Sequence, residues 1–115
     1  MAVWELEYWY SSGQNVAHDS SVEIWLDGLS DEQFKAVAKE LKLLEICGNN
    51  LRLPHSKALG RGLFELRERR FGYRIYYTFL VSSIVLLHVG DKTKQDKDIK
   101  IARKRLIELL IGENI

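Results

Sequence analysis

The sequence predicts an α+β fold, in which a small antiparallel sheet of about four strands has helices packed on one face. Three observations support this class. Apolar and polar residues alternate with period 2 near the N-terminus and in the middle of the chain, two consecutive segments open with helix-capping residues, and the last segment is an amphipathic helix. The expected order is strand, helix, helix, three strands and a final helix. No internal repeat, linker or low-complexity segment interrupts it, so we expect one domain over residues 1–115.

The N-terminal stretch Trp4–Tyr10, WELEYWY, alternates apolar residues with glutamates. Leu6 and Tyr8 fall on one face of an extended chain. Glu5 and Glu7 fall on the other face, which is the pattern of a half-buried strand. We expect this strand at an edge of the sheet.

Two helices are expected next, each opened by a serine and closed by a glycine. The first runs from Ser20, where SSVE matches a capping box, to Gly28. The second begins at Ser30 with the same device and continues to Gly48, with apolar residues at helical spacing. After the turn GNNLRLP, the lone proline, Pro54, marks the start of an expected loop.

The stretch Leu59–Phe79, LGRGLFELRERRFGYRIYYTF, predicts the central hairpin of the sheet. A turn centred on residues 70 and 71 sets Phe64 opposite Tyr77 and Leu66 opposite Ile75. Apolar residues of one strand then lie opposite apolar residues of the other, so this register is consistent with one face packed on a core.

The other face of this hairpin brings like charges together. The same register sets Arg67 opposite Arg74 and Glu65 opposite Tyr76. Facing arginines repel unless an anion or a carboxylate lies between them. Either Glu65 closes an interior salt bridge, or the face is a floor that binds phosphate. We favour the phosphate-binding face, because further arginines lie nearby and guanidinium groups bind phosphate oxygens in bidentate fashion.

The stretch Ile84–Val89, IVLLHV, is a continuous apolar run, as expected of a strand that is covered on both sides in the middle of the sheet. His88 joins the face of Arg67 and Arg74 if the paired residue numbers of the second hairpin sum to an even number. Because the strand is apolar, we expect His88 to be a core histidine. A final helix over Asp96–Ile111 turns a basic face outward.

Composition and charge narrow the class of protein. No apolar run approaches the roughly 18 residues that a membrane span needs, and the acidic, aromatic N-terminus is unlike a signal peptide. The lone cysteine, Cys47, excludes an internal disulfide and fits a reducing compartment, so we expect a cytoplasmic protein. Residues 1–50 carry three basic and nine acidic side chains, whereas residues 51–115 carry fourteen basic and seven acidic ones. Such a bipolar surface suits a polyanion on its basic side.

Four stretches support a family resemblance: LRLPHSKALGRGLFELR, GYRIYY, IVLLHVGDKTK and the terminal IARKRLIEL. With them the chain resembles the HigB-like, phage-derived branch of the RelE/ParE toxin superfamily, from the first strand to the last helix. The resemblance implies a RelE/ParE-like fold and the toxin of a type II toxin–antitoxin pair. It further implies an endoribonuclease that enters the ribosomal A site and cuts mRNA, and a cognate helix-turn-helix antitoxin as partner.

The resemblance also assigns roles to individual residues. Arg74, after Gly-Tyr, resembles the family's phosphate-contacting arginine. Arg67 occupies a position where RelE-type members carry a functional lysine, and Lys92 follows the last strand, where the family usually has a lysine or arginine. The chain departs from the family in DKTKQDKD, which lacks the tyrosine that often stacks on the cleaved base. Gly90 and Thr93 also stand where relatives have an aromatic residue and a second lysine.

The chemistry of RNA cleavage decides which residues are candidates. RNA needs no enzyme nucleophile, because its 2′-hydroxyl attacks the adjacent phosphate once a base removes the proton. Positioned cations stabilise the phosphorane, a histidine is the natural acid or base, and a tyrosine on the same face can stack on a base or donate a proton. The expected catalytic residues are Arg67, Arg74, Lys92 and His55, and the expected RNA-binding residues are Arg61, Arg69, Arg70, Tyr76, Lys57 and Lys94.

No cofactor is expected. The histidines His18, His55 and His88 show no metal-ligand spacing, and the sequence contains no glycine-rich phosphate loop and no nucleophile motif. Two other functions stay open from the sequence: a ParE-like toxin that inhibits DNA gyrase without cutting RNA, and an inactive member that only binds antitoxin and operator DNA. The absence of a tyrosine after Lys92 is the observation that favours an inactive member.

Overall fold

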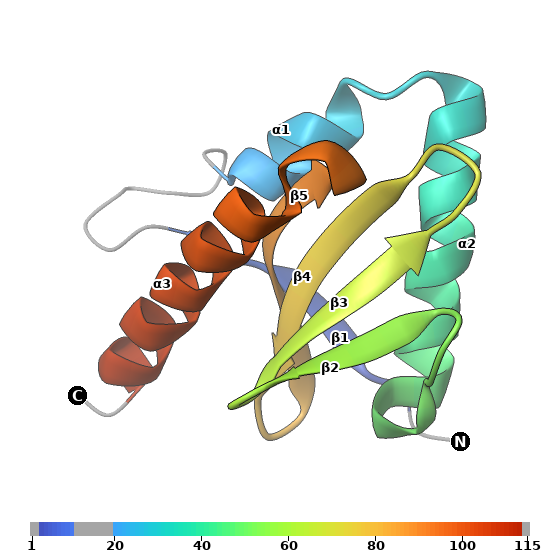
Figure 1. Cartoon of the computed structure of the whole chain (residues 1–115). Coiled ribbons are helices and arrows are strands. Elements are labelled where there is room, and N and C mark those ends of the chain that lie inside the picture. Colours follow the sequence, from blue (N-terminus) through green and yellow to red (C-terminus); the bar gives the residue numbers. More distant parts are fainter. Residues whose placement is uncertain (1–2, 11–19, 114–115) are drawn as a thin grey trace.

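A computed structural model describes residues 3–10 and 20–113, and it confirms the α+β class. A five-stranded sheet has the order β1-β5-β4-β3-β2, with three helices packed on it (Figure 1). None of the helices in the described part of the chain is long and apolar enough to cross a membrane. The elements are β1 (Glu5–Tyr8), α1 (Ser21–Asp27), α2 (Asp31–Cys47), η1 (Gly48–Asn50), β2 (Ser56–Gly60), β3 (Leu63–Glu68), β4 (Tyr73–Phe79), β5 (Ser83–Asp91), η2 (Lys92–Lys94) and α3 (Gln95–Glu113).

The sheet differs from the expected one in two ways. It has five strands, because β2 begins at Ser56, directly after the loop expected at Pro54, and pairs antiparallel with β3. Its sequence, SKALG, shows no apolar alternation, which is why the strand was not predicted. The sheet is also mixed, because β1 runs parallel to β5. β1 does lie at an edge, and β5 lies inside the sheet, as predicted.

The helices cover both faces of the sheet, which corrects the expectation that they share one face. On one face, side chains of α1 and α2 such as Val22 and Leu44 pack with Leu66 of β3. On the other face, Ala102 and Leu106 of α3 pack against the sheet. Figure 1 shows α2 and α3 on opposite sides of the strands. The physical reason lies in the apolar run of β5, whose side chains point to both faces and need cover on both.

Pairing of the central strands follows the predicted register. Phe64 lies opposite Tyr77, and Arg67 lies opposite Arg74. The β4–β5 pair contains an irregularity, since Tyr76 lies opposite His88 but Tyr77 lies opposite Leu86. The extra residue, Leu87, is a β-bulge that shifts the register by one. His88 therefore lies on the face of Arg67 and Arg74.

Both predicted helix starts are confirmed. The side chain of Ser20 accepts a hydrogen bond from the backbone of Glu23, and Ser30 and Gln33 form the complete capping box. At the end of α2, Gly48 adopts φ 51°, and a Cβ there would clash with the indole of Trp4. A glycine is required at this position both by the backbone angle and by the close approach of the Trp4 side chain.

The two-sided core gives a test of the fold. Leu106 lies on the side of α3 that faces the sheet and is 2% exposed. Replacing it with alanine should lower the free energy of unfolding by about 2–5 kcal/mol. Replacing its neighbour Ile107, which is 52% exposed, should change it by less than about 0.5 kcal/mol. Urea unfolding of both variants measures the difference, and equal effects would show that α3 does not pack on the sheet as described.

Candidate functional site

Two arginines face each other on neighbouring strands, close to the β3–β4 turn. Arg67 of β3 and Arg74 of β4 are directly paired, and Glu65 lies on the same face. Glu65 is fully buried, and its Oε1 accepts a hydrogen bond from Arg67 Nε at 2.9 Å. Its Oε2 accepts one from Gln95 Nε2 of α3 at 2.7 Å. Glu65 therefore forms the interior salt bridge that the sequence offered as one alternative, with Arg67 alone, and Gln95 of α3 is its second partner.

Arg74 lacks such a partner. Among the described residues, no carboxylate lies within 4.0 Å of its guanidinium, and its buried Nε has no hydrogen-bond partner. Arg74 is half-buried, so part of its guanidinium has lost water without gaining a counter-charge. Glu65 pairs with Arg67 alone, which leaves Arg74 without a carboxylate partner among the described residues. A guanidinium in this position can donate hydrogen bonds to an anion.

Tyr76 lies beside this pair and is fully buried. Its ring therefore offers no free face for a base, which corrects the expectation that Tyr76 stacks on RNA. Burial raises the pKa of Tyr76 well above its usual value, and the negative charges of Glu65 and Asp98 raise it further, whereas Arg74 opposes them. Tyr76 is therefore a neutral phenol at physiological pH. Within the described part of the chain, its hydroxyl is a buried polar group without a partner.

His88 is held on both sides by charged groups of α3. Its Nε2 lies 2.9 Å from Asp98 Oδ1, and its Nδ1 lies 3.3 Å from Arg105 Nη1. Because the guanidinium of Arg105 can only donate, Nδ1 accepts and Nε2 carries the proton toward Asp98. Gly90 makes the contact possible, since a Cβ there would clash with the Asp98 carboxylate. Both ring nitrogens are engaged, so His88 fixes α3 on the sheet.

The basic residues that follow β5 lie at the same end of the sheet as Arg67 and Arg74. Lys92 and Lys94 are exposed in the short turn η2, and the stem of Lys92 passes close to Gly72 in the β3–β4 turn. Arg69 and Arg70 are exposed in that same turn. This end of the sheet therefore collects exposed cations from two loops. Lys57 is exposed on β2 opposite Glu65.

Two predicted residues lie elsewhere. Arg61 is in the β2–β3 turn, at the opposite end of β3 from the β3–β4 turn, so it does not join the arginine pair as expected. His55 turns its ring toward α2, where Nδ1 lies 2.9 Å from Glu40 Oε2, although its backbone carbonyl accepts from Arg67 N. The structure therefore does not bring the His55 ring to Arg67 and Arg74. Sequence reasoning missed Glu40, Gln95 and Asp98, whose positions depend on how the helices pack.

Among the described residues, no group of three or more His, Cys, Asp or Glu side chains is placed to bind a metal ion. His18 lies outside the described residues. Cys47 is half-buried at the end of α2.

Comparison with models of known protein families gives a match to this chain. The model for "Phage derived protein Gp49-like (DUF891)" matches residues 24–107. The chain belongs to this Gp49-like, phage-derived family. The matched range includes the arginine pair, Glu65, Lys92 and most of α3. No curated protein shows a significant match to the chain.

The raised pKa of Tyr76 predicts how stability depends on alkaline pH. In the unfolded chain tyrosine ionises near pH 10, whereas folded Tyr76 keeps its proton, so its share of stability is present below about pH 10 and is lost above it. Tyr76→Phe should reduce the loss by up to about 1.4 kcal/mol per pH unit. Tyr8 and Tyr77, whose pKa values burial also raises, keep their contributions in this variant.

Urea unfolding between about pH 8 and 11 measures this effect. Identical pH profiles for the wild type and Tyr76→Phe would show that Tyr76 ionises as freely in the folded protein as in the unfolded chain.

Proposed function

We propose that the protein is the toxin of a type II toxin–antitoxin pair and that it cleaves mRNA on the ribosome. The observation that supports this most directly is Arg74, a half-buried cation with no carboxylate partner in the described part of the chain. Membership of the Gp49-like, phage-derived family is compatible with a toxin of this kind. The resemblance to HigB-like toxins points to RNA as the anion that Arg74 receives.

In the proposed mechanism the 2′-hydroxyl of one nucleotide loses its proton and attacks the adjacent phosphate, and the bond to the 5′-oxygen of the next nucleotide breaks. That oxygen takes up a proton, which leaves a 2′,3′-cyclic phosphate and a free 5′-hydroxyl end. During the attack, charge builds on the phosphorane oxygens, where a preorganised cation lowers the barrier most. Arg74 supplies that cation from the floor of the sheet. Arg67 lies directly across from it and is aligned by Glu65, so its other nitrogens can bind a second phosphate oxygen.

The lysines of η2 complete the proposed phosphate site. Lys92 and Lys94 are exposed beside the β3–β4 turn and can neutralise the phosphates that flank the cleaved bond. No tyrosine stands beyond Lys92 to stack on a base. The proposal therefore relies on electrostatic stabilisation, and the ribosome positions the message.

For proton transfer, neither described histidine is placed at the arginine pair. Of the two described histidines, His88 has both ring nitrogens engaged, whereas His55 has no partner for Nε2 among the described residues. The His55 ring lies toward α2, while the arginine pair faces α3. The proposed cut therefore does not use His55, and the proton is exchanged with solvent or with the ribosome.

A toxin of this type needs a neutralising partner. We propose a helix-turn-helix antitoxin, encoded next to this protein, and action in the cytoplasm on translating ribosomes. Residues 1–50 of this protein are net acidic and residues 51–115 are net basic, so an antitoxin can bind either an acidic or a basic region of it.

Substitution of Arg74 with alanine is the sharpest test. Purified protein should produce new 5′ ends on a defined message only when ribosomes are present. Arg74→Ala should cut about 100–1,000-fold more slowly, the usual cost of removing a positioned group that stabilises a developing anion. Its stability should not fall, because no carboxylate loses a partner. Arg67→Ala is less suitable, since it leaves Glu65 buried and unpaired.

Lys104→Ala is the matched control, because it removes one exposed positive charge from the outer face of α3. It should cut at the wild-type rate. Equal cutting by Arg74→Ala and the wild type would contradict the proposed site. Folded wild-type protein that makes no cuts would contradict the nuclease, and DNA damage with intact transcripts would then indicate a gyrase inhibitor.

A further inference from the structure

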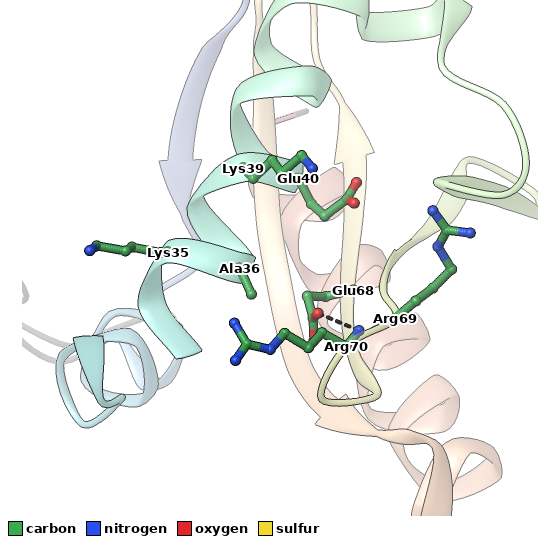
Figure 2. Close-up of a pocket in the computed structure, with 7 residues that line it drawn as sticks. All are labelled: Lys35, Ala36, Lys39, Glu40, Glu68, Arg69 and Arg70. Atoms are coloured by element: carbon green, nitrogen blue, oxygen red, sulfur yellow. Dashed lines mark hydrogen bonds between the residues drawn. The ribbon is translucent and has the colours of Figure 1, made fainter. Parts of the chain in front are cut away.

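A second group of cations lies between α2 and the β3–β4 turn. There a cavity of about 570 Å³ opens on the side of the sheet that α2 covers. Figure 2 shows α2 on one side of it and the turn on the other. Its lining is charged at almost every position: Lys35, Ala36, Lys39, Glu40, Glu68, Arg69 and Arg70.

Both carboxylates of the cavity are used within the protein. Glu68 is 3% exposed and accepts hydrogen bonds from the backbone N–H groups of Arg70 at 2.6 Å and Phe71 at 2.9 Å, so it holds the turn together. Glu40 is also buried and contacts Nδ1 of His55 at 2.9 Å. Neither carboxylate is therefore free to neutralise the cations around the opening.

The cations are far less constrained. Lys39 and Arg69 are exposed, and among the described residues no carboxylate lies within 4.0 Å of either charged group. Arg70 does pair with Glu32 at 3.2 Å, but the two side chains are 61% and 74% exposed, and such surface pairs contribute little. Lys35 points away from the turn in Figure 2, so Lys39, Arg69 and Arg70 form the cationic rim.

One cation of the rim is already oriented. The guanidinium of Arg70 lies 4.9 Å from the centre of the Phe71 ring, and this cation–π contact favours one orientation of the side chain. An arginine fixed in this way loses less side-chain entropy when it binds a phosphate. The rim therefore presents donors from a helix and from a turn to the same opening.

We infer that this cavity binds a phosphate of the single-stranded RNA that also crosses Arg67 and Arg74. The inference rests on the proposed function for the identity of the ligand. Arg69 lies in the β3–β4 turn, two residues after Arg67, so this turn connects the two cation groups, which lie on opposite faces of the sheet. RNA carries one negative charge per nucleotide and can therefore meet both groups.

The test measures RNA binding alone, without ribosomes and without cleavage. A fluorescently labelled single-stranded RNA is titrated with protein at several salt concentrations, and the slope of log K against log salt is compared between variants. Lys39→Ala/Arg69→Ala should lower the magnitude of this slope by about 0.7 for each phosphate contact that is lost. Lys100→Ala/Lys104→Ala removes the same net charge from exposed positions of α3 and should keep the wild-type slope.

The outcomes separate this inference from the nuclease proposal. A reduced slope in Lys39→Ala/Arg69→Ala alone supports the cavity, even if the wild type never cuts mRNA. Equal slopes in the two double variants overturn the cavity, even if Arg74 proves essential for cleavage. A wild-type protein that does not bind the RNA overturns the inference as well. Thermal unfolding confirms that each variant is folded.

Discussion

The arrangement of this protein depends on two arginines that are forced to face each other. The apolar register of β3 and β4 leaves no alternative, because shifting it by one residue would turn Leu66 and Ile75 away from the core. Glu65 pairs with Arg67, whereas Arg74 has no carboxylate partner among the described residues. An incompletely compensated cation lowers stability, and in the proposed function it is the group that binds phosphate.

The third helix is attached to this face by polar contacts as well as by apolar packing. Gln95 donates a hydrogen bond to the second carboxylate oxygen of Glu65. Asp98 can contact His88 because Gly90 has no side chain. Leu87, the extra residue of the β-bulge, turns His88 toward α3. These contacts place the start of α3 beside the arginine pair and leave the lysines of η2 exposed next to it. The polar residues of α3 thus support the site, while the basic residues around it stay accessible.

Local sequence patterns predicted the elements and the central register, because alternation in FELR and YRIYY pins the two strands to one pairing. They did not predict β2, whose edge strand SKALG has almost no apolar pattern, nor the position of α3 on the opposite face. At the site, the register predicted the opposed arginines and offered a Glu65 salt bridge as the alternative to a phosphate-binding face. The burial of Tyr76 and the turn of His55 toward Glu40 were not, because they depend on packing between distant elements.

The central claim is that Arg74 is kept available for an anion. The most direct test titrates inorganic phosphate at constant ionic strength and follows the thermal unfolding of the wild type and of Arg74→Gln. An anion that binds the folded protein raises its stability as its concentration rises. The account predicts that part of the stabilisation is present in the wild type and missing in Arg74→Gln. Equal stabilisation of both proteins across the titration would contradict it, because phosphate would then bind without Arg74.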